Sequence, residues 1–290
     1  GHNTGVGHKA GRNITTGTEN TLIGALAGDA LTDVDYNTAI GKSALSTDTL
    51  GSKSTALGAY ALQTQNFTTA TDSHNTAIGN NAGGAVTTGT LNTLIGSLAG
   101  DGLTTGSRNV AFGKDALTAD TLGSRSTAIG FATLYSQNFT TATDSFNVAV
   151  GEQAGLLVTT GIRNTLIGAF AGDALTDADS NVAIGYLALS GDTLGSRSVA
   201  IGDGALPIQN FTTATNAYNV AVGMFAGDQV TTGIENTLIG ALAGDSITTG
   251  TENILIGYQS EVSAADGVNQ IAIGIDINAG GNNNFSFGKA

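Results

Sequence analysis

The chain has 290 residues, of which 40% are hydrophobic and only 11% charged, with 43 Gly, one Pro, no Cys and a formal net charge of −13. The lack of Cys excludes a disulfide framework and a thiolate metal site. An acidic surface repels phosphate and anionic lipid, and no apolar run approaches the ~20 residues of a membrane span, so we expect neither nucleic-acid binding nor membrane insertion by this segment.

A five-residue box of the form Asn-Thr/Val-Ala/Leu-Ile/Val-Gly recurs along the whole chain. Its closing glycines follow one another in three 17-residue steps and one 21-residue step, and the fourth such quartet ends in a shorter step. The full quartet makes a 72-residue super-repeat with four copies, 3–74, 75–146, 147–218 and 219–290, which predicts one repetitive domain. Because residue 1 lies inside a repeat already under way, we expect a fragment of a longer chain. The closing glycines are Gly7, Gly24, Gly41, Gly58, Gly79, Gly96, Gly113, Gly130, Gly151, Gly168, Gly185, Gly202, Gly223, Gly240, Gly257, Gly274 and Gly288.

Each box predicts a short strand. The second and fourth residues, such as Thr21 and Ile23, share one strand face, and we expect that face to form the core. The third residue, such as Leu22, then points the other way, toward a contact with something else. We expect the closing glycine to turn the chain, and the alanine three residues later, such as Ala27, to begin a return strand. Thr, Asp, Gly and Ser fill the remaining turns.

The first box position is Asn in thirteen of the seventeen boxes, and Ser or Gln in the others. Two interpretations stay open: a stacked ladder that hydrogen-bonds neighbouring turns, or an Asn that merely tolerates a tight turn. A 17-residue unit is too small to bury its own apolar face, so the units must stack. The sequence therefore predicts an all-β parallel β-solenoid with one coil per 17- or 21-residue repeat, seventeen coils making roughly 80 Å. Helical and leucine-rich repeats do not fit this composition or spacing.

The segment Asn37-Thr38-Ala39-Ile40-Gly41-Lys42-Ser43-Ala44 resembles the head repeat of trimeric autotransporter adhesins, and also repeats of bacteriophage tail fibres. The resemblance covers nearly the whole chain. It implies a left-handed parallel β-roll, a homotrimeric rod, and an adhesive or structural fibre segment outside the cell, on a bacterial surface or a virion. A cell-surface receptor or glycan would be the partner. The family's repeat is commonly shorter than the one found here, so the resemblance implies longer outer loops in this chain.

The alternative to a trimeric fibre is a monomeric solenoid that binds a glycan, calcium or an ice surface. Calcium is suggested by Asp33-x-Asp35-x-Asn37 and Asp177-x-Asp179-x-Asn181, whose alternating oxygens resemble the start of a calcium loop but lack its later Gly and Glu. Solvated turn carboxylates are the interpretation we favour, and we assign no metal site. Thr-Thr pairs in the turns recur in the same coil of each quartet rather than in adjacent coils, which argues against ice binding.

Catalytic signals are missing from the sequence. The three histidines are isolated, and no nucleophile elbow, zinc-binding motif or complete phosphate-binding loop is present. We therefore expect no enzyme and no cofactor. The remaining candidates are the four-residue insertions of the long coils, one in each of the first three super-repeats. They are either contact loops for a receptor or glycan, or segments whose Phe covers the end of the coil core, and we favour the second. Their residues are Phe67, Phe139, Phe211, Asn66, Asn138 and Asn210.

Overall fold

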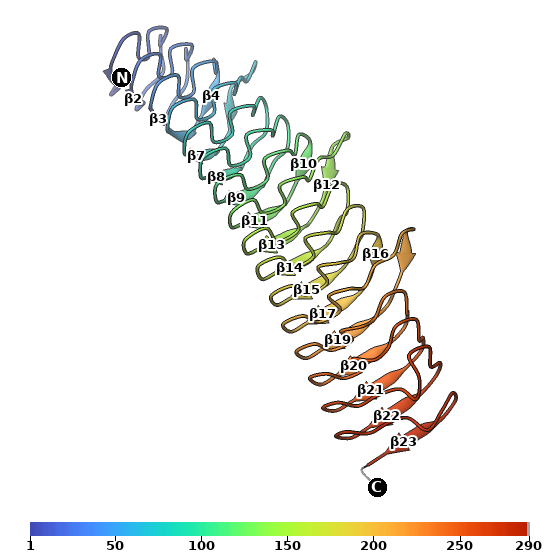
Figure 1. The fold of residues 1–290 in the computed structure, drawn as a ribbon. Helices are drawn as coiled ribbons and strands as arrows, with labels where there is room; N and C mark the ends of the chain where they lie inside the picture. The colour runs from blue at the N-terminus through green and yellow to red at the C-terminus, as the bar shows by residue number, and fades with distance from the viewer. Residues whose placement is uncertain (289–290) are drawn as a thin grey trace. The chain divides into compact units, whose positions relative to one another are not determined.

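The computed structural model describes residues 1–288, and among these it contains strands, turns and bends but no helix. The fold is an all-β parallel solenoid, as the repeat predicts. By its contacts the chain divides into two compact units, residues 1–146 and 147–290, so the boundary falls between the second and third super-repeats. Each unit is described by itself. Within each, one coil of chain forms a rung, and each rung carries one box strand (Figure 1).

Box strands in the first unit pair in parallel with the strand of the next rung. Thr21, Leu22 and Ile23 lie beside Thr38, Ala39 and Ile40, one 17-residue step along the chain. The 21-residue step keeps the same register, with Thr55 beside Thr76, because the four extra residues are taken up outside the strand. The box strands are β1 (Thr4–Val6), β2 (Thr21–Ile23), β3 (Thr38–Ile40), β5 (Thr55–Leu57), β7 (Thr76–Ile78), β8 (Thr93–Ile95), β9 (Val110–Phe112) and β11 (Thr127–Ile129).

The second unit repeats this arrangement with the same parallel register. Each long coil of the chain adds a two-residue strand that pairs with one in the coil before it. The box strands here are β13 (Val148–Val150), β14 (Thr165–Ile167), β15 (Val182–Ile184), β17 (Val199–Ile201), β19 (Val220–Val222), β20 (Thr237–Ile239), β21 (Ile254–Ile256), β22 (Ile271–Ile273) and β23 (Phe285–Phe287). The two-residue pairs are β4 (Gly51–Ser52) with β6 (Thr71–Asp72), β10 (Gly123–Ser124) with β12 (Thr143–Asp144), and β16 (Gly195–Ser196) with β18 (Thr215–Asn216).

The direction of the box side chains is opposite to the sequence-based expectation. The third residue faces the core: Ala39 is 0% exposed and Leu22 1%. The fourth residue faces outward, with Ile23 36% and Leu57 41% exposed. Alternation along a strand makes neighbouring side chains point to opposite sides, but it does not decide which side is inside. The coil interior is too narrow for both the second and the fourth box residue on every rung. The prediction that the second and fourth residues form the core was therefore wrong.

The predicted return strand is also absent. The segment that begins near Ala27 is a series of turns, in which Leu26 and Gly28 have φ of 62° and 54°. Strands require negative φ, so these residues cannot extend the ladder. Successive rungs are joined here by separate backbone hydrogen bonds, such as those from Gly28 N to Ala44 O and from Ser43 N to Ala25 O, both at 2.9 Å. Ala27 nevertheless lies in the core, at 0% exposure.

The core is filled by matching large residues with small ones. Where the box carries Leu, as at Leu94, the position four residues after its glycine is Gly100. A Cβ on Gly100 would lie 2.7 Å from the Leu94 Cδ2 atom. Where the box carries Ala, the matching position is a buried leucine on some rungs, as at Ala39 with Leu45. On others, as at Ala77, it is a glycine, Gly83, and leucines of the neighbouring rungs reach into the space. These side chains, together with further buried residues such as Leu31 and Leu103, fill the interior at the density that folded proteins require.

Candidate interaction surface

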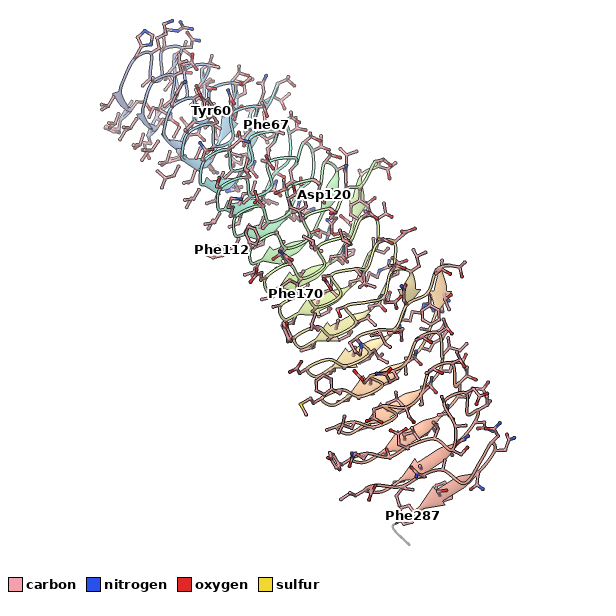
Figure 2. The ribbon with its side chains drawn as sticks, in the orientation of Figure 1. Tyr60, Phe67, Phe112, Asp120, Phe170 and Phe287 are labelled. Atoms are coloured by element: carbon pink, nitrogen blue, oxygen red, sulfur yellow. The ribbon has the colours of Figure 1, made fainter. Side chains whose placement is uncertain are left out.

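The outward sides of the box strands form a face with two parallel rows. The first row contains the second box residues, mostly Thr in the first unit, and the second row contains the fourth box residues, mostly Ile, Leu, Val or Phe. Phe112 in the second row is 52% exposed and projects away from the core (Figure 2). In the first unit the second row is Val6, Ile23, Ile40, Leu57, Ile78, Ile95, Phe112 and Ile129.

Such a row is unusual for a surface that water covers. A scattered exposed Ile needs no explanation, but a contiguous apolar patch marks a contact surface. Charged side chains are absent from both rows of the box strands described. Because neighbouring rungs are paired strands, successive side chains within each row lie only about 4.8 Å apart along the stack. We call this surface the strand face.

Two columns of side chains border the strand face. The leading column consists of the residues directly before each box, such as Lys53 and Leu91, and most have φ near +60°. The trailing column consists of the two residues after each box glycine, such as Tyr60 and Leu98 at the second place. Left-handed backbone turns the leading side chains outward, while their N–H groups bond the preceding rung, as from Lys53 N to Asp35 O at 3.0 Å. These columns carry most of the chain's Lys and Arg residues.

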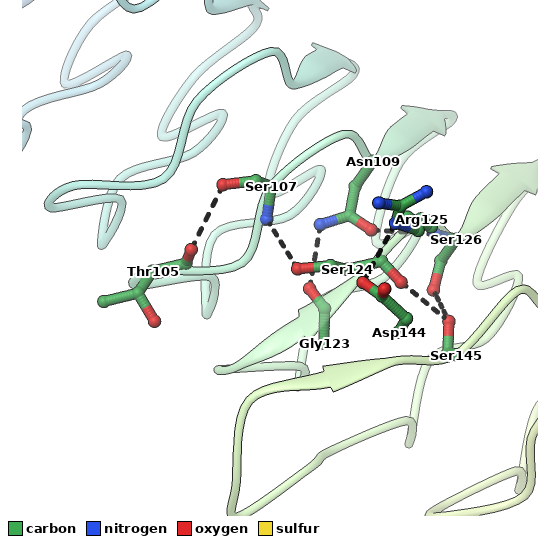
Figure 3. A network of polar contacts seen from close by, with 9 residues as sticks. All are labelled: Thr105, Ser107, Asn109, Gly123, Ser124, Arg125, Ser126, Asp144 and Ser145. Atoms are coloured by element: carbon green, nitrogen blue, oxygen red, sulfur yellow. Dashed lines mark hydrogen bonds and ion pairs between the residues drawn. The ribbon is translucent and has the colours of Figure 1, made fainter. Parts of the chain in front are cut away.

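A ladder of buried asparagines runs along one side of the coil, which confirms the first of the two interpretations. Asn109 donates from Nδ2 to Gly123 O at 3.0 Å and accepts from Ser126 N at 2.9 Å (Figure 3). Its own N–H donates to Asn92 Oδ1 at 3.0 Å. Each such Asn thereby satisfies backbone groups of neighbouring rungs from a buried position.

A buried carboxylate network holds each 21-residue coil. Asp120 is 0% exposed and accepts hydrogen bonds from Gly123 N at 2.9 Å and Gln137 Nε2 at 2.6 Å. Gln137 also donates to Ser126 Oγ, which shares a 2.5 Å hydrogen bond with Ser145 Oγ. Asp48 and Asp192 occupy the equivalent positions in the other long coils. Burial raises the pKa of Asp120 and Asp192, while their hydrogen bonds act to lower it.

This network predicts a pH dependence that can be isolated with Asp120→Asn. A carboxyl whose pKa is raised in the folded chain stabilises the fold below its unfolded pKa, and that contribution is lost as pH rises through the folded value. The unfolding free energy of the native chain, relative to D120N, should therefore rise from pH 7 to pH 4. Urea unfolding followed by circular dichroism at both pH values measures it. A difference that is constant or falls toward pH 4 contradicts the prediction; D192N should repeat the result.

The phenylalanines of the insertions cover the core rather than project from it. Phe67 is 5% exposed, and Phe139 and Phe211 are similarly buried. Phe67 packs on Gly51 of the preceding rung, where a Cβ would lie 2.7 Å from its ring. These three side chains are therefore not available to a receptor, in line with the interpretation favoured from sequence. The neighbouring Asn66, Asn138 and Asn210 accept hydrogen bonds from Thr49, Thr121 and Thr193 hydroxyls at 2.9 to 3.0 Å.

The candidate calcium turns bond the chain itself. Asp35 Oδ1 accepts from Thr18 N at 2.7 Å, and Asp179 Oδ1 from Ile162 N at 2.8 Å. Asp33 and Asp177 accept from the hydroxyls of Thr16 and Thr160, one rung away. Within residues 1–288, no group of three or more His, Cys, Asp or Glu side chains is placed to hold a metal ion. These carboxylates thus serve as links between rungs.

Comparisons with known proteins add no identification. No protein-family model matches the chain, and no curated protein matches its sequence. In the part of the chain described by the structure, no helix has the length and apolar character needed to cross a membrane. The strand face and its bordering columns are therefore the features from which function must be argued.

Proposed function

We propose that this chain is a structural and adhesive segment of an extracellular fibre, on a bacterial surface or a virion, and that it assembles as a homotrimer. The observation that carries the proposal is the strand face, where apolar side chains repeat on rung after rung with no covering element among the described residues. Burying this row between copies would remove it from water, at a gain of roughly 25 cal/mol per Å² of apolar surface. The resemblance to adhesin head and tail-fibre repeats supports the same assembly.

Parallel rungs suit a fibre because each one contacts only its neighbours. Stability then accumulates along the stack, and length can change by whole repeats. Backbone hydrogen bonds join every rung to the next, and the asparagine ladder and the matched core recur with the 72-residue super-repeat, so whole super-repeats can follow one another. Attachment to a receptor or glycan would be a property of exposed loops, such as the parts of the 21-residue coils around Asn66, Asn138 and Asn210.

Light scattering of the purified chain tests the assembly. We expect a mass of about 86 kDa, three times the 28.8 kDa of one chain, with a β-type circular dichroism spectrum. A 28.8 kDa particle with the same spectrum would contradict the trimer and favour the monomeric alternative. Replacing the second-row residues Leu57, Phe112 and Ile129 by Lys should lower the mass toward one chain without loss of β signal, because these side chains already face outward.

Ice binding is a second candidate, and one observation favours it. The first row of the strand face presents Thr on six successive rungs, Thr4 to Thr93, whereas the sequence had suggested no regular Thr array. Thr residues in the turns, in contrast, use their hydroxyls to bond the next rung, as from Thr32 Oγ1 to Thr49 O at 2.9 Å. Thermal hysteresis of a monomeric preparation decides between the two functions, since trimer formation by the strand face would cover this row.

A further inference from the structure

The insertion of each 21-residue coil carries the three-residue sequence Asn-Phe-Thr. It occurs once in each of the first three super-repeats, at residues 66–68, 138–140 and 210–212. The pattern Asn-x-Ser/Thr, in which x is not Pro, is the acceptor motif for attachment of a sugar to the Asn side chain, and used motifs lie in surface loops. A motif this short can also arise by chance, so its structural setting has to decide whether it is a site.

The packing of the insertion directs the Asn and Thr side chains outward. Phe67, the middle residue, is 5% exposed, and its N–H donates to the buried Asp48 carboxylate at 3.2 Å. Thr68 on one side of it is exposed, and Asn66 on the other side is half-buried. The same arrangement recurs in the other two insertions, where both neighbours of the Phe are exposed. The folded chain therefore presents both polar side chains of the motif while the Phe stays in the core.

The fold leaves the two groups that sugar transfer requires unbonded. Among the described residues, neither the Asn66 Nδ2 group nor the Thr68 hydroxyl forms a hydrogen bond, and the same holds for the other two insertions. The Thr49 hydroxyl lies 3.0 Å from both Asn66 Oδ1 and Phe67 O. Whichever oxygen takes its single proton, at least one N–H of the amide stays unbonded. The amide carbonyl also persists after a sugar is attached to the nitrogen, so this contact is kept.

The motif occurs at two other places in the sequence, and there the fold uses its hydroxyl. In the first coil, Thr15 ends the motif, and its Oγ1 donates to Thr32 O at 3.4 Å. In the coil of β23, Ser286 ends the motif, and its Oγ accepts from Gly280 N at 3.2 Å. Neither of these two motifs recurs in the other super-repeats. Among the described residues, an exposed and unbonded Thr hydroxyl is thus specific to the motifs of the insertions.

We infer that Asn66, Asn138 and Asn210 are acceptor sites for N-linked sugars. The donor is a sugar activated as a nucleoside diphosphate. The bond from Asn Nδ2 to the sugar C1 atom forms while the bond from C1 to the phosphate oxygen breaks, the nucleoside diphosphate leaves, and one amide proton passes to a base of the transferase. An attached sugar is bulky and solubilising, which suits a chain that exposes an apolar row.

This inference goes beyond the fibre function and does not depend on the trimer. The insertions lie outside the strand face, since the two-residue strands of the long coils form sheets separate from the box strands (Figure 1). In the first unit, Asn66 and Asn138 are four rungs apart, about 19 Å, so each has room for a sugar. A monomer and a trimer would both present these sites.

Sugar transfer to the folded chain tests the inference. The chain is incubated with UDP-glucose and a soluble glucosyltransferase that modifies Asn-x-Ser/Thr, and modified peptides are mapped by mass spectrometry. Synthetic peptides of all five motifs give the rate that each sequence allows without the fold. We expect glucose on Asn66, Asn138 and Asn210 at rates near those of their peptides. Transfer to Asn13 and Asn284 should fall about fivefold or more below their peptides, because a hydrogen bond of the motif hydroxyl must break first.

Two results would overturn the inference: no glucose on the three asparagines of the insertions, or equal chain-to-peptide ratios at all five motifs. The same peptide map of the chain isolated from its natural source should show sugar on these three asparagines. Unmodified asparagines there would also overturn the inference.

Two neighbouring threonines give a matched control. T68A should lose the glucose on Asn66 and keep the other two, because the motif needs the hydroxyl two residues after the Asn. T69A should keep all three, although Thr69 is exposed as well. Both variants should retain the β-type circular dichroism spectrum, since these side chains do not contribute to the core. Loss of the Asn66 glucose in both variants, or in neither, contradicts the inference.

Discussion

Gly113→Ala is expected to cause a loss of stability on the order of 4 kcal/mol or more, a large effect for one added methyl group. Gly113 has φ of +144°, and an added Cβ would lie 2.2 Å from Gly130 O and 2.6 Å from Gly130 C. Both atoms belong to the backbone of the next rung, which is fixed by its own ladder and cannot move aside. Urea unfolding followed by circular dichroism measures the effect.

A matched control separates the steric clash from backbone strain. Gly281 has a similar φ of +137°, but nothing lies within 4 Å of the position its Cβ would take. Gly281→Ala should therefore cost only the strain of the left-handed backbone, about 1–3 kcal/mol. Equal losses in the two variants would mean that φ alone, and not contact between rungs, requires the glycine. Two-state analysis suits small domains better than repeat arrays, so hydrogen exchange near β9 and β11 should accompany the unfolding curves.

Asn109→Ala is expected to give the second largest effect, about 3 kcal/mol or more. Removing the amide leaves Gly123 O and Ser126 N without their partners inside a buried ladder (Figure 3). Each orphaned group costs about 1–3 kcal/mol when it is buried away from water. Thermal and urea unfolding measure the loss. Asn138→Ala, at an exposed amide of the insertion, is the control and should stay within about 0.5 kcal/mol of the native chain.

Asn109→Asp distinguishes the donor function of the amide from its acceptor function. The carboxylate still accepts from Ser126 N but cannot donate to Gly123 O, and burial opposes its charge. We expect a deficit at pH 7 that shrinks toward pH 4, where the protonated acid is neutral and can donate. A deficit that does not change with pH would show that the amide donor contributes little.

The repeat in the sequence was sufficient to predict the fold class. Seventeen-residue spacing, a strand-forming box and a fixed glycine require one rung per repeat, because only stacking buries such short units. The asparagine ladder was one of two interpretations that the sequence left open, and the structure decided for it. The Phe of each insertion was correctly favoured as a cover for the core.

What the sequence could not decide was which side of each box strand is inside. Period two separates Leu22 from Thr21 and Ile23 but gives no preference between the two sets, and the bulkier set was the wrong choice. The packing inside the coil decides: at these two places it pairs Leu with Gly, Ala with Leu or, as at Ala77 and Gly83, two small residues. The space inside the coil is set by the turns around Ala27, where Leu26 and Gly28 have positive φ and Ala27 between them does not. Only the packed structure therefore shows that the apolar rows face outward, where a second copy can meet them.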